Sequence, residues 1–374
     1  MPMRYIWQHI NTIIDTYSGS MPLAHFLKNY FKQHPILGSR DRKIISAMMY
    51  SWYRCARGIG DKEWLNGLMA QWLNGKFANF QIAQWLSDNK DTVSFDIKGL
   101  FPFDIALSEG ISKDEWLQSM LVQPDLFIRI RKDRANILML LNKQQIPYTA
   151  ITDTCLALPN GAKIDALLPP DSYVVQDASS QKTGAFFMPE KNELWYDCCA
   201  GAGGKSLLLK DQEPGVRLTV TDLRESIIHN LHQRFRLYGH VLPVAHVTDV
   251  ANKEQLEKAL GGKQFDNIIC DAPCSGSGTW ARTPEQLYFS DPTALEHFTA
   301  LQKKIALNVS RHLKPGGRLI YITCSVFKNE NEMVIDELVK ETGLQLEQSQ
   351  IINGVGIHAD SMYVGVLKTP NLSR

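Results

Sequence analysis

Apolar positions in the first third of the chain recur with helical spacing. Within residues 40–57 (RDRKIISAMMYSWYRCAR) the intervals are four, four and three, at Ile44, Met48, Trp52 and Cys55. This spacing is typical of a helix with one buried face. Similar periods and few β-branched runs continue to about residue 125, so residues 1–125 are predicted to form a helical domain.

Residues 126–175 have a different pattern and are predicted to form a small α/β connector. The stretch LFIRI favours a short strand, and a helix is expected to open near Asp133. The chain is expected to become extended again after Pro147.

From about residue 176, apolar strands alternate with helices. The expected strands are LWYDCCA, RLTVTDL, VAHVTDV, FDNIICDAP and GRLIYITCS, and residues 224–238 and 294–313 are helix candidates. Strands that are almost continuously apolar imply a parallel sheet with helices on both faces. Residues 176–374 are therefore predicted to form an α/β domain whose ligands bind at the carboxyl ends of the strands.

Composition narrows the class of protein. The chain has 374 residues, of which 44% are hydrophobic and 21% charged, as in a globular protein of two or three domains. No apolar run reaches the roughly 18 to 20 residues of a membrane span, and the N-terminus has no signal-like apolar stretch. We expect a cytoplasmic monomer with no membrane partner. The net charge is +1, but residues 1–60 carry eight Lys/Arg and two Asp/Glu, which predicts a basic stripe there.

The loop DCCAGAGGKS (197–206) follows the first strand of the α/β domain and opens a helix. Its glycines let a ligand approach the backbone closely, beside a helix N-terminus. A P-loop needs glycine where Cys199 stands, and a dinucleotide motif needs glycine where Ser206 stands. The remaining candidate is a nucleoside without pyrophosphate, with Asp222, 18 residues after Gly204, on its ribose. S-adenosylmethionine is such a ligand.

Two more strands end in an acid. Asp249 follows the third strand, where it can accept a hydrogen bond from an adenine amino group, and Asp271 closes the fourth. One such acid is equally well explained as a cap of the next helix. Three consecutive strands ending in an acid favour a cofactor site.

Seven scattered cysteines indicate a reduced compartment rather than a disulfide framework. The pair Cys270 and Cys274 has no second cluster nearby, so no metal is expected. Cys270 lies in an apolar run and is predicted to be packing, as are Cys55, Cys155 and Cys198. Cys274 and Cys324 each stand where a strand ends, so both thiols are expected to open onto the cofactor crevice.

A thiol beside a methyl donor indicates methylation of an unactivated carbon, such as carbon 5 of a pyrimidine. A thiolate that adds to C6 makes C5 nucleophilic enough to take the methyl group. Asp271 is placed to share the proton at N3, and loss of the C5 proton then releases the thiol. The residues alone do not rank Cys274 and Cys324.

Four stretches resemble, in order and spacing, the motifs of the RsmB/Nop/Sun group of RNA 5-methylcytosine methyltransferases. They are QDASSQ (176–181), CAGAGGKS (199–206), DAPCSGSGTWARTPE (271–285) and GGRLIYITCSVFKNENE (316–332). The resemblance implies a Rossmann-like class I methyltransferase domain over residues 176–374. A weaker similarity of LGSRDRKIISAMMYSWYR (37–54) implies a NusB-like N-terminal domain over residues 1–125.

The resemblance also implies roles. Cys324 is the nucleophile, Cys274 helps to release the product, and Asp271 lies beside the reacting base. The implied cofactor-binding residues are Cys199, Ala200, Gly201, Ala202, Gly203, Gly204, Lys205, Asp222, Asp249 and Asp271. The chain departs from the family pattern at three places: Ala202 replaces a proline, Ile227 an arginine, and DSMY (360–363) the usual DGFF.

The implied partner is RNA, with ribosomal RNA favoured by the NusB-like similarity and transfer RNA left open. Amino methylation is disfavoured because DAPC lacks the [DN]-P-P-[YF] motif of such enzymes. An RNA-binding assembly factor with a vestigial site is disfavoured because every cofactor and thiol position holds a competent residue. A basic cluster is a candidate for phosphate contacts or for a solvated face: Arg129, Arg131, Lys132 and Arg134.

Overall fold

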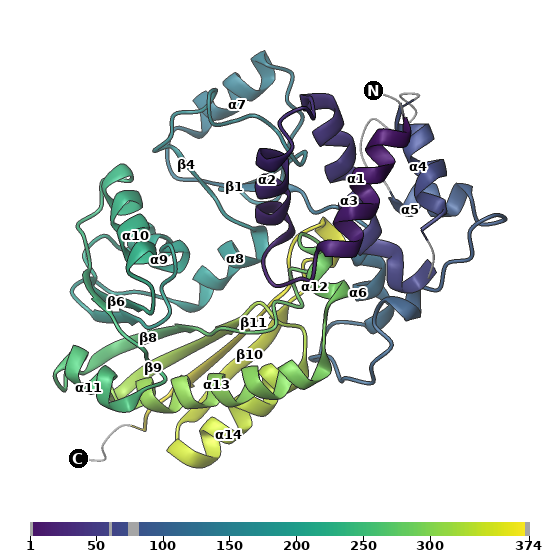
Figure 1. Ribbon diagram of the computed structural model, residues 1–374. Helices are drawn as coiled ribbons and strands as arrows, with labels where there is room; N and C mark the ends of the chain where they lie inside the picture. The colour runs from purple at the N-terminus through teal and green to yellow at the C-terminus, as the bar shows by residue number, and fades with distance from the viewer. Residues whose placement is uncertain (1–2, 60–61, 74–81, 371–374) are drawn as a thin grey trace. The chain divides into compact units, whose positions relative to one another are not determined.

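The computed structural model describes residues 3–59, 62–73 and 82–370 (Figure 1). The chain divides into two compact units. One is drawn from residues 1–104, 112–124 and 279–292, and the other from residues 105–111, 125–278 and 293–374. Both units therefore contain segments that are distant in sequence.

The first unit is helical. Its elements are α1 (Met3–Thr16), α2 (Leu23–Gln33), α3 (Ser39–Ile59), α4 (Trp64–Leu73), α5 (Ile82–Asp88), η1 (Ile97–Leu100), α6 (Lys113–Met120) and α12 (Pro284–Tyr288). The predicted helix over residues 40–57 lies within α3. The four residues that define its apolar stripe, Ile44, Met48, Trp52 and Cys55, are all buried, which confirms the helical spacing.

Residues 279–292 pack with this helical unit, although they lie inside the range 176–374 in the sequence. The guanidinium of Arg54 is buried and donates to the Ala281 carbonyl at 2.8 Å. Arg57 donates to the Ser290 carbonyl at 2.9 Å, and Glu285 accepts from the backbone N–H of Leu23 at 3.1 Å. Two of the eight cations of residues 1–60 therefore have structural roles.

The second unit begins with a four-stranded antiparallel sheet of order β2-β3-β1-β4. Its elements are β1 (Leu126–Ile130), α7 (Arg134–Lys143), β2 (Thr149–Ala150), β3 (Cys155–Leu158) and β4 (Tyr173–Val175). The Asp133 carboxylate accepts from the backbone N–H of Asn136 and so caps α7. The strand, the helix start and the return to extended chain match the sequence prediction.

The main sheet has seven strands in the order β10-β11-β9-β8-β5-β6-β7. They are β5 (Leu194–Asp197), β6 (Arg217–Asp222), β7 (Val244–Val247), β8 (Phe265–Asp271), β9 (Leu313–Thr323), β10 (Gln345–Ile352) and β11 (Met362–Lys368). The five predicted strands are parallel. Contrary to the sequence prediction, the sheet is not entirely parallel, because β11 runs antiparallel to β9 and β10 runs antiparallel to β11.

Helices cover both faces of this sheet (Figure 1). Apolar side chains of α11 (Lys253–Leu260), α13 (Pro292–Ser310) and α14 (Glu332–Thr342) form one core with it. Those of η2 (Thr183–Phe186), α9 (Gly204–Gln212) and α10 (Glu225–Leu237) form a second core on the opposite face. The remaining short elements are α8 (Ala178–Lys182), η3 (Lys328–Glu330) and η4 (Val355–Ile357). The layers confirm the predicted α/β class.

Within the described part of the chain, no helix is both long and apolar enough to cross a bilayer.

Candidate active site

The glycine loop lies between β5 and α9, as predicted. Gly201 and Gly203 both have positive φ, 52° and 82°, a conformation that side chains with a Cβ rarely adopt. A Cβ placed on Gly201 or Gly204 would meet no atom within 4 Å, so open space adjoins the loop backbone there. This free space at the start of a helix lets a ligand approach the loop backbone, as the predicted cofactor requires.

Asp222 closes β6 and faces the loop. Its Oδ2 accepts from the Gly201 N–H at 3.1 Å, and its Oδ1 accepts from the backbone N and Nε of Arg224 at 3.0 and 3.3 Å. Arg224 thus contacts Asp222, whereas the family pattern has its arginine later, at the position of Ile227. The backbone N–H groups of Gly201 and Arg224, together with Arg224 Nε, orient the carboxylate at the edge of the loop.

Asp249 lies after β7 and has local hydrogen bonds. Its Oδ1 accepts from the Ala251 N–H at 2.9 Å, two residues along the chain, before α11 begins. This is a local turn, whereas the cap of α11 is Asn252, whose side chain accepts from the Gln255 N–H. The contact of Asp249 with an adenine stays a prediction.

Asp197 was not singled out from the sequence, although it opens the motif DCCAGAGGKS. It is fully buried, and the Ser206 hydroxyl donates to its Oδ2 at 2.6 Å. Burial raises the pKa of this carboxyl group to about 7. The bond ties the end of β5 to the first turn of α9 and so shapes the loop between them.

Lys205 connects the glycine loop to the end of β8. Its Nζ lies 3.0 Å from Asp271 Oδ2, and its side chain is only 7% exposed, whereas that of Asp271 is 30% exposed. The predicted catalytic acid is therefore held by a buried cation and still has an open side toward which a base can approach.

The two thiols meet at the carboxyl ends of neighbouring strands. β8 and β9 are adjacent and parallel, with Asp271 opposite Ile322. Cys274 Sγ and Cys324 Sγ, which follow these strands, lie 3.3 Å apart, and both residues are half-buried. The two sulfurs are therefore neighbours, and their opening onto the cofactor crevice stays a prediction.

The loop that carries Cys274 is anchored to the Cys324 backbone. The Gly278 N–H donates to the Cys324 carbonyl at 2.9 Å, and Ser361 N–H donates to the Gly278 carbonyl at 2.9 Å. A Cβ on Gly278 would lie 2.0 Å from the Ser361 carbonyl oxygen, so only glycine fits. The Ser277 and Ser325 hydroxyls, 3.0 Å apart, add a second link between the two loops.

Glu330 is a buried acid behind Cys274 that sequence reasoning missed. Its carboxylate accepts from the Ser275 backbone N–H at 2.8 Å, from the Ser275 hydroxyl at 2.5 Å and from Gln302 at 2.9 Å. Gln302 also donates to the Pro273 carbonyl at 3.0 Å. Glu330 and Gln302 thus hold the residues on both sides of Cys274, which are Pro273 and Ser275. The available signal was the NENE sequence directly after the TCS motif.

The pKa of the Cys274 thiol lies well above its ordinary value. The main cause is its hydrogen bond with Cys324, followed by burial and by electrostatic interaction with Cys324 and with Glu330. Cys274 is therefore held as a protonated thiol near neutral pH, and a protonated thiol is a poor nucleophile.

Replacing Glu330 by alanine is expected to loosen the Cys274 loop, because three hydrogen-bond donors lose their acceptor. A displacement of about 1 Å at a reacting group can lower the rate by up to about 10²-fold. We therefore expect a lower kcat with little change in the KM for the methyl donor. The matched control is Glu337→Gln, on the half-exposed side of α14. Wild-type kcat in Glu330→Ala, with the protein folded, would contradict this positioning role.

Four of the other cysteines are structural. Cys270 is fully buried in the core between the sheet and α11, α13 and α14. Cys55, Cys155 and Cys198 are buried as well, in agreement with the packing interpretation. Among the residues that the structure describes, no group of three or more His, Cys, Asp or Glu side chains is arranged to hold a metal ion.

The basic cluster after β1 does not form one exposed face. Arg129 and Arg131 have side chains only 7% and 10% exposed, and both pair with Asp211. Lys132 and Arg134 are exposed, and each contacts the connector, at Asp171 and at the Asp153 carbonyl. The solvated-face interpretation therefore applies to two of the four residues at most.

The amino-acid sequence matches one protein family and several relatives. Residues 185–368 match the family described as 16S rRNA methyltransferase RsmB/F. A "Ribosomal RNA small subunit methyltransferase B" of Shewanella oneidensis is 29% identical over 73% of this chain and 65% of its own length. The Klebsiella pneumoniae protein of that name is 31% identical over 45% of this chain. The chain spans 38% of the length of the Klebsiella protein in this match.

Two solved structures share the fold. "Crystal Structure of PH0851" has a TM-score of 0.68 at 17% identity and covers 91% of this chain and 93% of its own. "NSun6 from Pyrococcus horikoshii with SFG" has a TM-score of 0.60 at 13% identity, over 68% of this chain and 94% of its own.

The sheet order, the glycine loop and the acid on β6 are features shared with methyltransferases, the class of protein whose cofactor is S-adenosylmethionine. The match over residues 185–368 places this catalytic domain in the RsmB/F family, within the RsmB/Nop/Sun group that its motifs resemble.

Proposed function

We propose that this protein methylates carbon 5 of a cytosine in RNA through a covalent bond between Cys324 and C6 of the base. The observation that carries the proposal is the 3.3 Å separation of Cys274 Sγ and Cys324 Sγ at the ends of two adjacent parallel strands. Methylation of an oxygen or nitrogen atom needs no thiol, whereas a C5 carbon becomes reactive only after a nucleophile adds to C6.

The residues at the site supply the steps on the base. The Cys324 sulfur bonds to C6 as its proton passes through the Asp271 carboxylate to N3. When bound by the glycine loop and Asp222, S-adenosylmethionine would supply the methyl group to C5. The C5 proton then passes to the Cys274 sulfur while the Cys274 thiol gives its own proton to the departing Cys324 sulfur, 3.3 Å away. The C6–S bond breaks, and loss of the N3 proton restores the aromatic ring and both thiols.

The order of the two thiols is the one that the family resemblance implies. Glu330 and Gln302 hold the residues on either side of Cys274, and the hydrogen bond with Cys324 raises the pKa of the Cys274 thiol. These contacts support Cys274 as the thiol that exchanges protons during release, with Cys324 as the nucleophile.

Small-subunit ribosomal RNA is the proposed substrate, because relatives carry that name and the matched domain has the same description. The test uses purified protein, labelled methyl donor, and either ribosomal or transfer RNA from a host strain that lacks the gene. We expect labelled 5-methylcytidine in digests of the ribosomal RNA. Label only in transfer RNA would move the substrate, and label on an exocyclic amino group would overturn the C5 chemistry.

A further inference from the structure

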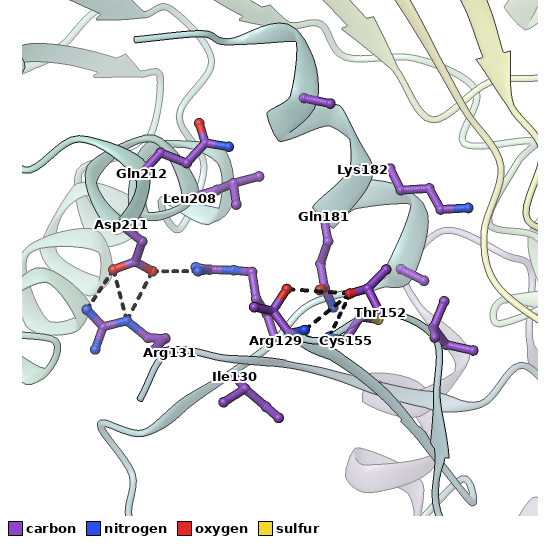
Figure 2. A pocket seen from close by; sticks show the side chains of 14 residues that line it. Arg129, Ile130, Arg131, Thr152, Cys155, Gln181, Lys182, Leu208, Asp211 and Gln212 are labelled. Atoms are coloured by element: carbon purple, nitrogen blue, oxygen red, sulfur yellow. Dashed lines mark hydrogen bonds and ion pairs between the residues drawn. The ribbon is translucent and has the colours of Figure 1, made fainter. Parts of the chain in front are cut away.

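A cavity lies in the same unit as the candidate active site, and different residues line it. This cavity of about 440 Å³ is bounded by β1, the turn before β3, α8 and the second half of α9 (Figure 2). Its volume is in the range of pockets that bind small ligands. Helix α9 begins at the glycine loop with Gly204, and its residues Leu208 and Asp211 reach the cavity. At 1.5 Å per residue, the cavity lies roughly 6 to 10 Å further along this helix.

One wall of the cavity carries positive charge. Asp211 lies between two guanidinium groups, with Arg129 Nη1 at 2.6 Å and Arg131 Nη2 at 2.7 Å (Figure 2). Burial opposes ionisation of Asp211, but hydrogen bonds from His240 and Arg131 and the charge of Arg129 outweigh it and hold its pKa below the usual range. Two cations thus face one carboxylate, and Lys182 on α8 adds a third cation to the lining.

Arg129 has an unused donor. Its Nε donates to Gln176 at 2.9 Å and its Nη1 pairs with Asp211, but its Nη2 is buried with no hydrogen-bond partner among the described residues. Buried guanidinium N–H groups are nearly always paired in folded proteins. Arg129 is also one of the residues that line the cavity, so its spare donor favours an anionic acceptor there.

The rest of the lining suits a nucleotide. Thr152 and Thr154 contribute hydroxyl groups next to the cations, and Ile151 and Leu208 contribute apolar surface. A guanidinium fork with nearby hydroxyls is suited to a phosphate group, and flat apolar surface suits a base or ribose.

We infer that this cavity binds one nucleotide of the RNA strand, outside the methylated base, with its phosphate at the Arg129 end. This inference rests on the proposed RNA substrate. The cavity residues are separate from the glycine loop and the thiols, so the bound nucleotide is a second point of attachment that holds the strand while the target cytosine reacts.

Two variants test the cavity without disturbing the core. Ala185 and Lys182 line it and are exposed, so Ala185→Trp fills the mouth and Lys182→Glu reverses a charge. For each variant, the Kd for a labelled fragment of ribosomal RNA is measured as a function of salt, together with kcat and KM. The matched control is Lys163→Glu, an exposed residue of the connector that is not part of the lining.

We expect both variants to raise the Kd and the KM for RNA about tenfold, with kcat and binding of the methyl donor unchanged and with Lys163→Glu like wild type. Lys182→Glu should also lower the salt slope of binding by about one. Cytidine monophosphate and inorganic phosphate serve as competitors. Binding of either compound alone, lost in Ala185→Trp while RNA binding is unchanged, would make this a free-nucleotide or phosphate site and overturn the inference.

Unchanged Kd and KM for RNA in both variants would also overturn it, while the proposed methylation would stand. If the wild-type protein transfers no methyl group to any RNA, the proposed function fails, and the RNA-binding assay still reports on the cavity separately.

Discussion

Replacing Cys324 by serine is expected to lower the rate of methyl transfer by a factor on the order of 10⁴, because a hydroxyl group is a far weaker nucleophile toward C6 than a thiol. Cys324 is only half-buried, and serine is slightly smaller, so the fold and the glycine loop should be unaffected. Single-turnover assays with labelled methyl donor measure the rate. Calorimetric binding of the donor and the Tm show that the variant is intact.

The matched control for this substitution is Cys270→Ala. Cys270 lies on β8, is fully buried, and is separated from Cys274 by three residues. Cys270→Ala removes a sulfur from β8, the strand beside β9, and leaves both Cys274 and Cys324 in place, so methylation close to that of wild type is expected. Equal activity of Cys324→Ser and wild type would assign the attack to another group.

Replacing Cys274 by alanine is expected to stop the reaction after methylation, with RNA still bound covalently to Cys324. The thiol at 3.3 Å that assists release is then missing, while the attacking sulfur and Asp271 are retained. A slowly migrating protein–RNA band on a denaturing gel measures the trapped species, and it should contain the transferred methyl label.

The double variant Cys274→Ala with Cys324→Ser is the control for the trapped species and should give no band. A single Cys274→Ala variant that turns over normally, or that forms no adduct and binds RNA like wild type, would remove Cys274 from the release step. An adduct that forms only in the absence of methyl donor would place its role before methyl transfer.

Much of the second unit could be predicted from the sequence, because burial on both faces leaves a strong pattern. Continuous apolar runs followed by an acid or a thiol gave the five parallel strands, their carboxyl ends and the packing role of Cys270. The two antiparallel strands were harder. β10 (QLEQSQII) is mostly exposed and polar, so hydrophobic periodicity carries almost no signal for it.

Other features depend on contacts between residues that are far apart in sequence. Glu330 reaches Ser275 over 55 positions, and Arg131 reaches Asp211 over 80, so neither partner is visible from local spacing. Residues 279–292 join the helical unit through the buried Arg54 and the partly buried Arg57. From composition alone, these two residues count only as positive charge. Asp249 shows the opposite limit, because an acid that closes a local turn and an acid that contacts a cofactor have the same sequence signature.

The nucleophile is tested most directly with RNA that contains 5-fluorocytidine. Fluorine at C5, unlike hydrogen, cannot leave as a cation. The covalent intermediate therefore accumulates on whichever sulfur attacked. Trypsin and nuclease digestion then separate the two candidates, because residues 319–328 (LIYITCSVFK) contain Cys324 alone and residues 264–282 contain Cys270 and Cys274. Mass spectrometry should find the methylated nucleotide on residues 319–328. An adduct on residues 264–282, or no adduct on either peptide, would contradict the attack by Cys324.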